Sequence, residues 1–364
     1  MRYDKAIIIA YERVDVMAVK KSSIRVAVVG FGFMGRMHYG VWKRMKGAKV
    51  VALCDKDRTQ FETTIKGGNL AGADESLDFG DALICDDFDQ MLADVKPDVV
   101  DITLPTPLHP VLAIKALEQG ISVLCEKPMA LTSAACDQMI KAAKKAPNGA
   151  QLMIAQCLRF WPAFQFLKTL IDSGKYGKPL AASFRRYSTM PGWGKGKSWF
   201  ADESRSGGVA LDLHIHDADL VQFLFGLPTA VTSRATYHED GHMQYISTLY
   251  DVGNITVTAE GSWCMAPAFG FEANYIVTFE KAVVVLDGKR EKPLAIYPVK
   301  GDVIVPKLKP EEGYYYEIQW FLDKLRGKKV PCLTTPEASR NSVALIEAEK
   351  QSAKSGKTVK VRGK

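Results

Sequence analysis

The sequence predicts a two-domain protein: a doubly wound α/β domain with a parallel sheet, then an α+β domain with a large, mostly antiparallel open sheet. Three observations predict this architecture. The chain has 364 residues, a length that suits two domains. In the first half, short apolar runs alternate with helix-like segments, which is typical of parallel βα units. Beyond residue 150, extended segments follow one another closely without helices between them, which is typical of antiparallel pairing.

In the first half, four apolar runs are expected as buried strands, and four further segments are expected as helices. The strands are expected at Ile24–Val29, Val50–Cys54, Val99–Leu104 and Ser122–Cys125, and the helices at Arg36–Lys46, Phe88–Leu92, Pro110–Gln119 and Ser133–Lys145. Because the strands are continuously apolar, the sheet should be covered on both faces. The turn residues Pro147-Asn148-Gly149 end the pattern, so we expect the first domain to span residues 23–149.

The second domain, residues 150–364, is expected to begin with helices at Pro162–Asp172 and Gly208–Phe225, the latter ending at Gly226. Six strands follow, at Ala230–Tyr237, Met243–Asp251, Ile255–Ser262, Ala273–Phe279, Ala282–Leu286 and Leu294–Pro298. Two helices, Gly313–Leu325 and Pro336–Ser355, are expected to close the domain. Turn residues such as Asp287-Gly288 separate the strands and favour hairpins.

Composition narrows the function classes. The net charge of +7 is mild for this length, and basic residues do not alternate with aromatic ones, so we expect no nucleic-acid partner. No apolar run approaches the ~18 residues of a membrane span, so we expect no membrane partner. The seven cysteines are odd in number and include no CxxC pair, which predicts reduced thiols in a cytoplasmic protein. Residues 1–22 are expected as a disordered extension, or the native protein starts at Met17 and residues 1–16 do not belong to it.

A glycine loop, Gly30-Phe31-Gly32-Phe33-Met34-Gly35, follows the first expected strand and opens a helix. This is the dinucleotide-binding pattern of Rossmann domains. Gly30 permits the tight turn, Gly32 lets the pyrophosphate approach the backbone, and Gly35 lets the helix pack closely. The amides of Phe33 and Met34 should then point at the phosphates, aided by the helix dipole.

Asp55 ends the second expected strand, 20 positions after Gly35. Its carboxylate suits the two adenosine ribose hydroxyls and repels a 2′-phosphate, so we predict NAD as the cofactor. The neighbouring Lys56 and Arg58 offer charges for a phosphate, and NADP therefore stays open as the less favoured alternative.

Three further segments carry chemistry: Leu104-Pro105-Thr106-Pro107-Leu108-His109, Cys125-Glu126-Lys127-Pro128, and Gly207 to Asp217. The first two follow strands whose carboxyl ends should line the ligand crevice. With the glycine loop, they resemble the Gfo/Idh/MocA family of glucose-fructose oxidoreductase, inositol dehydrogenase and their relatives. The resemblance runs from about Ile24 to Val359. In the first domain it covers the glycine loop, the following His38, Leu104-Pro105-Thr106 with two substitutions, His109, and Glu126-Lys127-Pro128 in full. In the second domain it covers Gly207, Gly208, Asp212 and His216.

The resemblance implies catalytic roles for Lys127, Asp212 and His216, and the chemistry makes independent sense. Hydride leaves a carbinol carbon as the hydroxyl proton is removed, and His is the usual base. Lys127 would hydrogen-bond the same oxygen and favour its developing charge. Asp212 and His216 are four apart and should share a helix face, where Asp212 binds a substrate hydroxyl, tunes His216, or both. We also expect Leu104, Pro105, His109, Glu126 and Lys127 to contact the cofactor.

Other residues are less clearly assigned by the sequence. Arg159 either contacts a polar substrate or pairs structurally. Trp199 ends a loop rich in Gly, Lys and Trp, and its ring suits sugar C–H surfaces. His214 stands where many family members have Gly, and we expect it in the substrate pocket. A metal is not expected, since residues two apart on a helix point apart and do not chelate easily. For His38 and His109 we favour structural or cofactor-neighbour roles.

The expected function is hydride transfer between NAD(P) and a secondary alcohol of a sugar, sugar derivative or cyclitol. One alternative is a glycoside-cleaving enzyme that keeps NAD bound and uses transient oxidation to drive elimination. Another is a non-catalytic NAD(P)-binding sensor. Because an open antiparallel sheet often packs against a copy of itself, we expect a homodimer or homotetramer.

Overall fold

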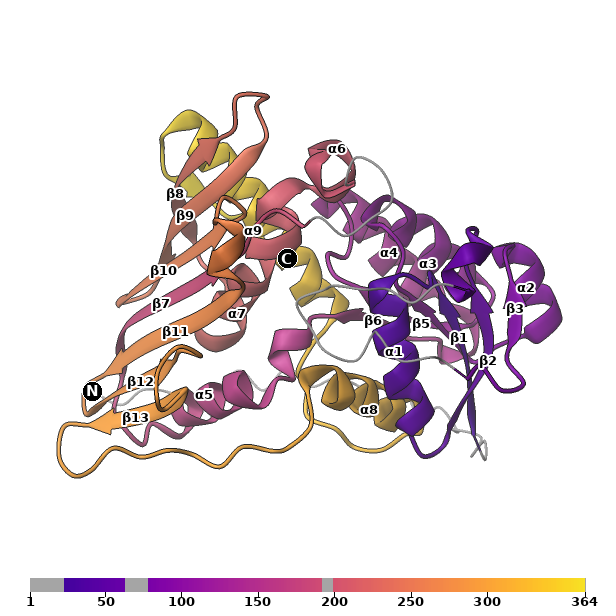
Figure 1. Ribbon diagram of the computed structural model, residues 1–364, viewed down its shortest axis with the longest axis horizontal. Helices are drawn as coiled ribbons and strands as arrows, with labels where there is room; N and C mark the ends of the chain where they lie inside the picture. Colours follow the sequence, from indigo (N-terminus) through magenta and orange to yellow (C-terminus); the bar gives the residue numbers. More distant parts are fainter. Residues whose placement is uncertain (1–22, 63–77, 192–198, 364) are drawn as a thin grey trace.

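A computed structural model describes residues 23–62, 78–191 and 199–363. Two bodies are evident, a sheet flanked by helices in the indigo-to-magenta half and a larger open sheet in the magenta-to-orange half (Figure 1). The extension expected at residues 1–22 lies outside the described residues. Within the described ranges, no helix is both long enough and apolar enough to cross a membrane.

The first body is the predicted parallel sheet with helices on both faces. Its six strands have the order β3-β2-β1-β4-β5-β6, and every pair is parallel. Bounds are β1 Ile24–Val29, β2 Ala48–Cys54, β3 Leu83–Cys85, β4 Val99–Ile102, β5 Ser122–Glu126 and β6 Leu152–Ala155, with helices α1 Phe33–Arg44, α2 Phe88–Val95, α3 His109–Glu118 and α4 Ser133–Lys145. Strands β3 and β6 were not predicted, and β6 carries the sheet past residue 149.

Helix α1 begins at Phe33 and not at Arg36, the residue from which the sequence predicts it. The helix therefore starts inside the glycine loop, and its first turn includes Phe33, Met34 and Gly35. This arrangement brings the positive end of the helix dipole directly to the loop.

The second body is the predicted mostly antiparallel sheet. Its eight strands have the order β13-β12-β11-β7-β10-β9-β8-β14, and β7 with β10 is the parallel pair. Bounds are β7 Pro179–Tyr187, β8 Ala230–Tyr237, β9 Met243–Val252, β10 Ile255–Ser262, β11 Glu272–Phe279, β12 Ala282–Leu286, β13 Leu294–Pro298 and β14 Val359–Lys360. Strands β8 to β13 confirm the prediction within one residue, whereas β7 and the two-residue β14 were not predicted.

Among the described residues, helices cover one face of this sheet and leave the other open. Along β7, buried residues alternate with partly exposed ones, as a sheet with one solvated face requires. Helices α5 Pro162–Ser173, α7 Ile215–Phe225 and α9 Pro336–Ser355 lie between the open sheet and the first body (Figure 1). Helix α9 also packs against α4, and α8 Gly313–Leu325 packs against α1, so the chain's last helices join the two bodies.

Candidate active site

A cavity of about 1210 Å³ lies where the carboxyl ends of the parallel strands face the second body. The first body contributes the glycine loop and the residues that end β2, β4 and β5. The second contributes the end of β7, the start of α7 and the segment from Leu308 to Glu312. This is the edge at which doubly wound sheets bind their ligands.

Each glycine of the loop has a distinct steric reason, as the sequence predicts. Gly30 has a φ of +93°, and a β-carbon there would lie 2.8 Å from the Leu104 side chain. A β-carbon on Gly35 would lie 1.9 Å from the Gly30 carbonyl oxygen. Gly32 lines the cavity and has nothing within 4 Å of its β-carbon position, which leaves open space above the backbone. The loop therefore fits a pyrophosphate that passes over Gly32 toward the start of α1.

Asp55 lies beside this loop and lines the cavity. Its carboxylate accepts hydrogen bonds from the backbone N–H of Phe31 at 2.6 Å and of Asp57 at 2.9 Å. These bonds hold the carboxylate in place between the glycine loop and the end of β2. Lys56 is exposed, and the Arg58 guanidinium lies 3.5 Å from Asp86.

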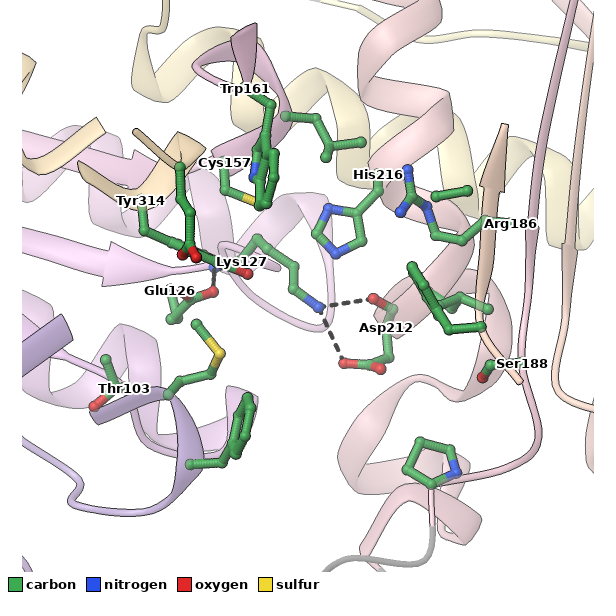
Figure 2. Close-up of a pocket in the computed structure, with 18 of the residues that line it drawn as sticks. Thr103, Glu126, Lys127, Cys157, Trp161, Arg186, Ser188, Asp212, His216 and Tyr314 are labelled. Atoms are coloured by element: carbon green, nitrogen blue, oxygen red, sulfur yellow. Dashed lines mark hydrogen bonds and ion pairs between the residues drawn. The ribbon is translucent and has the colours of Figure 1, made fainter. Parts of the chain in front are cut away.

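Lys127, Asp212 and His216 come together on the cavity wall, and Figure 2 shows their side chains close to one another. The Lys127 ammonium donates to the Asp212 backbone carbonyl at 2.8 Å and to its carboxylate at 3.2 Å. Burial, with the nearby cations Lys127 and Arg186, lowers the pKa of His216 well below its usual value. The imidazole is therefore uncharged at neutral pH, the form that accepts a proton.

The segment that carries Asp212 differs from the single helix expected at Gly208–Phe225. A short helix α6, Glu203–Ser206, comes first, and a π-helical turn at Ala210–His214 then leads into α7. Gly207 and Gly208 separate them with φ of +79° and +71°, a conformation that favours glycine at both positions. The wide turn directs both the carbonyl and the carboxylate of Asp212 toward Lys127, and such π-turns are frequent at functional sites.

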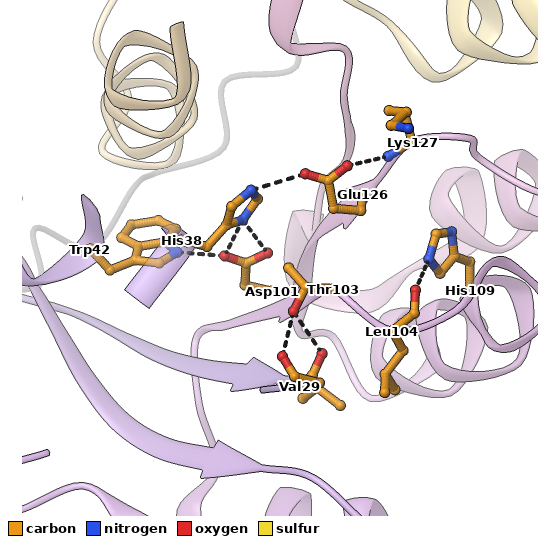
Figure 3. A network of polar contacts seen from close by, with 10 residues as sticks. Val29, His38, Trp42, Asp101, Thr103, Leu104, His109, Glu126 and Lys127 are labelled. Atoms are coloured by element: carbon orange, nitrogen blue, oxygen red, sulfur yellow. Dashed lines mark hydrogen bonds and ion pairs between the residues drawn. The ribbon is translucent and has the colours of Figure 1, made fainter. Parts of the chain in front are cut away.

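A buried polar chain lies behind Glu126 (Figure 3). The His38 Nδ1 is 2.9 Å from Asp101, and its Nε2 is 3.0 Å from Glu126, whose other oxygen accepts the Lys127 backbone N–H at 3.0 Å. Burial disfavours a charged imidazole, but the two carboxylates outweigh it and raise the pKa of His38 well above its usual value. His38 is thus a buried cation that orients Glu126, in keeping with the structural role favoured from the sequence.

Four residues predicted at the cofactor or substrate site do not line the cavity: Gly35, which packs against Gly30 instead, His109, Arg159 and His214. His109 is buried, with its ring nitrogens 2.7 Å from the Leu104 carbonyl and 2.9 Å from the Pro128 carbonyl. It ties together the loops that follow β4 and β5, so it acts behind the cavity wall. Leu104 and Pro105 do line the cavity, as predicted.

Arg159 forms a bidentate pair with Asp219, at 2.7 Å for both contacts, and is nearly fully buried. The sequence left open whether Arg159 contacts a polar substrate or pairs structurally, and in the structure it forms the structural pair. His214 was expected in the substrate pocket, but its side chain does not line the cavity. Its Nε2 lies 2.9 Å from the buried Glu349 carboxylate on α9. The reason is geometric: two residues apart on the helical segment, His214 and His216 point in opposite directions.

Several cavity residues were not predicted from the sequence as site residues. Arg186, at the end of the unpredicted β7, is held by Asp217 at 2.7 Å and lies beside His216 (Figure 2). Trp161 and Tyr314 line the same wall from two different helices' N-termini, with ring centres 6.1 Å apart. Trp199 also lines the cavity, as predicted, whereas residues 192–198 of its loop lie outside the described residues.

One group of ligand-type side chains lies away from the cavity, on the turn between β8 and β9. The ligand atoms of His238, Asp240 and His242 lie within 4.8 Å of one another. The two imidazole rings stack at 4.7 Å with an angle of 17° between them. A metal ion lies in the plane of each imidazole that binds it, so these nearly parallel rings would have to turn before they shared an ion.

The comparisons with known proteins agree with this geometry. Residues 24–154 match the family model described as an oxidoreductase family with an NAD-binding Rossmann fold, and residues 164–285 match the model of the Gfo/Idh/MocA C-terminal domain. D-apiose dehydrogenase of Paraburkholderia graminis is 28% identical over 352 residues, which cover 92% of this chain and 89% of that protein. Inositol 2-dehydrogenase of Ralstonia nicotianae is 26% identical over 337 residues, 90% of this chain and 92% of that protein.

A solved structure of levoglucosan dehydrogenase, in complex with NADH and levoglucosan, superposes with a TM-score of 0.79 at 20% identity. The match covers 93% of this chain and 99% of that one. At this level of identity, the likeness shows that the two proteins share the whole two-domain fold.

Proposed function

Because this chain belongs to the Gfo/Idh/MocA family of NAD(P)-binding oxidoreductases, we propose that it transfers a hydride between NAD(H) and a secondary alcohol of a sugar, sugar derivative or cyclitol. The observation that carries the proposal is the convergence of Lys127, Asp212 and His216 on one cavity with the glycine loop. The relatives named as apiose and inositol dehydrogenases support the substrate class.

The proposed roles follow from the contacts of each side chain. Bound NAD supplies the hydride acceptor. His216, uncharged because of burial and the cations near it, takes the proton of the substrate hydroxyl. The Lys127 ammonium donates a hydrogen bond to the same oxygen and stabilises its negative charge. Asp212 holds Lys127 in place through its carbonyl and carboxylate.

Asp55 supports NAD over NADP. Its carboxylate is held beside the glycine loop by two backbone N–H groups, where a ribose 2′-phosphate would meet its charge. Arg58, a candidate partner for such a phosphate, lies against Asp86 instead. Calorimetric titration with NAD and with NADP tests this assignment, and tighter binding of NADP would contradict it.

A screen of sugars and cyclitols for NADH formation, run with Lys127→Ala as the control variant, tests the proposed reaction. Turnover should disappear in the variant while NAD binding stays largely intact, because the Lys127 ammonium acts mainly on the substrate oxygen. Undiminished turnover in the variant would refute the assignment. Release of an aglycone without net NADH would instead identify the glycoside-cleaving alternative, and tight NAD binding with no turnover on the whole panel would favour a sensor.

We also propose that the open face of the eight-stranded sheet joins copies of the chain into a dimer or tetramer. Leu249 on β9 is 48% exposed and lies between the buried Thr248 and Tyr250, so its side chain is on this open face. Light scattering coupled to size-exclusion chromatography measures the assembly, and a monomer at micromolar concentration would contradict the proposal.

A further inference from the structure

Strands β2 and β3 end on two cysteines that lie side by side. Cys54 and Cys85 are paired positions in the parallel ladder, so both side chains point to the same face. Neighbouring strands lie about 4.8 Å apart, and disulfide-bonded cysteines have Cα atoms roughly 4.4–6.8 Å apart. The Cys85 sulfur lies 3.6 Å from the Leu53 carbonyl oxygen, which shows that it is turned toward β2.

The two thiols differ in their surroundings. Cys54 is buried, whereas Cys85 is partly exposed. A hydrogen bond from the Cys54 thiol lowers the pKa of Cys85, with help from Arg58 and against burial, Asp86 and Asp87. The same contact, together with burial, raises the pKa of Cys54. Because Cys85 is the more exposed of the two, a peroxide reaches its sulfur first, with the buried Cys54 thiol beside it.

The other five cysteines lack this combination. Cys125, Cys136 and Cys157 are buried, and burial raises the pKa of each thiol. Cys264 and Cys332 are exposed, and neither is a paired neighbour of another cysteine in the sheets. Cys54 and Cys85 therefore differ from the other cysteines, because they are paired neighbours and one of them is partly exposed.

Both cysteines are bonded through their backbones to the dinucleotide cradle. The Cys54 carbonyl accepts the N–H of Gly30 at 2.8 Å, and the Cys85 carbonyl accepts the N–H of Asp55 at 3.1 Å. Asp55 in turn accepts the N–H of Phe31. A shift of either strand end is therefore transmitted to the glycine loop and to Asp55, the carboxylate proposed to bind the ribose.

We propose that Cys54 and Cys85 form an oxidation site, that a peroxide converts them to a disulfide, and that this disulfide weakens dinucleotide binding. The Cys85 thiolate attacks the peroxide, forming an S–O bond as the O–O bond breaks and hydroxide leaves. The Cys54 sulfur then attacks the sulfenic sulfur, forming the S–S bond, and water leaves with its proton. Two thiols supply the two electrons that reduce hydrogen peroxide to two waters.

The expected effect on binding comes from the geometry of the bond. Cβ atoms of paired parallel positions are separated by roughly the strand spacing of about 4.8 Å, whereas a disulfide holds them about 3.8 Å apart. Closure must therefore draw the ends of β2 and β3 together, and Gly30 and Asp55 are hydrogen-bonded to those ends. The proposal depends on the dinucleotide cradle and not on the alcohol substrate, so a failed substrate screen leaves it standing.

The experiment uses the full chain, reduced and then treated with hydrogen peroxide. Peptide mass spectrometry without reduction should find the Cys54–Cys85 cross-link. Calorimetry should show that the Kd for NAD rises by about tenfold, equivalent to about 1.4 kcal/mol, and returns to the starting value after dithiothreitol. Cys85→Ser should form no cross-link and keep its NAD affinity under peroxide. A Cys264→Ser/Cys332→Ser variant, which removes the exposed thiols, should respond as the original chain does.

Two results would overturn the proposal. The first is recovery of Cys54 and Cys85 as free thiols, or as separately oxidised residues, after peroxide has oxidised Cys264. The second is a cross-link that forms in full while the Kd for NAD stays unchanged. Since cross-linking is measured on peptides and binding on the intact protein, neither readout depends on catalytic turnover.

Discussion

Substituting alanine at Gly35 and at Gly32 should separate the steric roles of the two glycines. At Gly35 the new β-carbon would lie 1.9 Å from the Gly30 carbonyl oxygen. Non-bonded carbon and oxygen atoms stay about 3.3 Å apart or more, so one of them must move by about 1.4 Å. The obstacle is backbone, which cannot rotate away as a flexible side chain does. We therefore expect Gly35→Ala to lower the free energy of unfolding by about 3 kcal/mol, the upper end of typical overpacking.

Gly32→Ala should behave in the opposite way. Its φ of −72° and ψ of −158° suit alanine, and nothing lies within 4 Å of the added carbon. The free energy of unfolding of the ligand-free protein should therefore change by less than about 0.5 kcal/mol. The methyl group instead fills the space through which the pyrophosphate approaches, so NAD affinity should be lost.

Thermal unfolding with and without NAD measures both effects. Gly35→Ala should lower the Tm by about 6–12 °C, at roughly 2–4 °C per kcal/mol for domains of this size. At an NAD concentration of 100 Kd, the original chain gains about 2.7 kcal/mol, whereas Gly32→Ala should gain none. A Gly35→Ala protein with the original Tm would refute the close-packing argument. A Gly32→Ala protein with the full NAD-dependent shift would refute the path assigned to the pyrophosphate.

Three more predictions concern the buried ionisable groups. Arg159→Met should lower the free energy of unfolding by about 3–5 kcal/mol, because it leaves the buried Asp219 without its cation. Urea unfolding measures this change. A variant with unchanged stability and a raised KM would instead identify Arg159 as a substrate contact. Because the pKa of His216 is lowered well below its usual value, kcat/KM should stay flat through neutral pH and fall only below about pH 6.5; a fall centred above pH 7 would contradict its assignment as the base. The pKa of His38 is raised, so its stabilising contribution is complete below about pH 6.5, the unfolded value, and is lost as pH rises toward the folded pKa. The stability difference between the original chain and His38→Gln should therefore shrink with rising pH, and a difference that grows would show that His38 is not a buried cation.

The sequence predicted most elements of the fold because their signals are local. Strand β1 and five of the six strands from β8 to β13 start at the predicted residue. An apolar run or an alternating pattern in the sequence marks each of these strands directly. Strand β7 was missed because its sequence, PLAASFRRY, is rich in small and charged residues. The buried Arg186 on this strand pairs with a residue far along the chain, Asp217. Strand β6 was missed because it comes directly after the turn that was taken as the domain boundary.

The candidate site divides in the same way. Gly30, Gly32, Asp55, Lys127, Asp212 and His216 all line the cavity where the sequence predicts them to act. The direction of neighbouring side chains was not predictable. His214 and Arg159 are polar residues next to site residues, yet each turns to a buried carboxylate, Glu349 or Asp219. Their burial is favourable only because those partners, supplied by α9 and α7, are present.

By itself, the sequence determined the features that depend on near neighbours in the chain: the glycine cradle with its steric requirements, the alternation of strands and helices, and the identity of the ionisable residues at strand ends. Only the tertiary structure decided which ionisable groups face the cavity and which are paired behind it. It also decided that Cys54 and Cys85, 31 positions apart in the sequence, lie side by side. The physical reason is that a buried charge or thiol takes its properties from whatever packs against it, and distant segments of the chain supply those contacts.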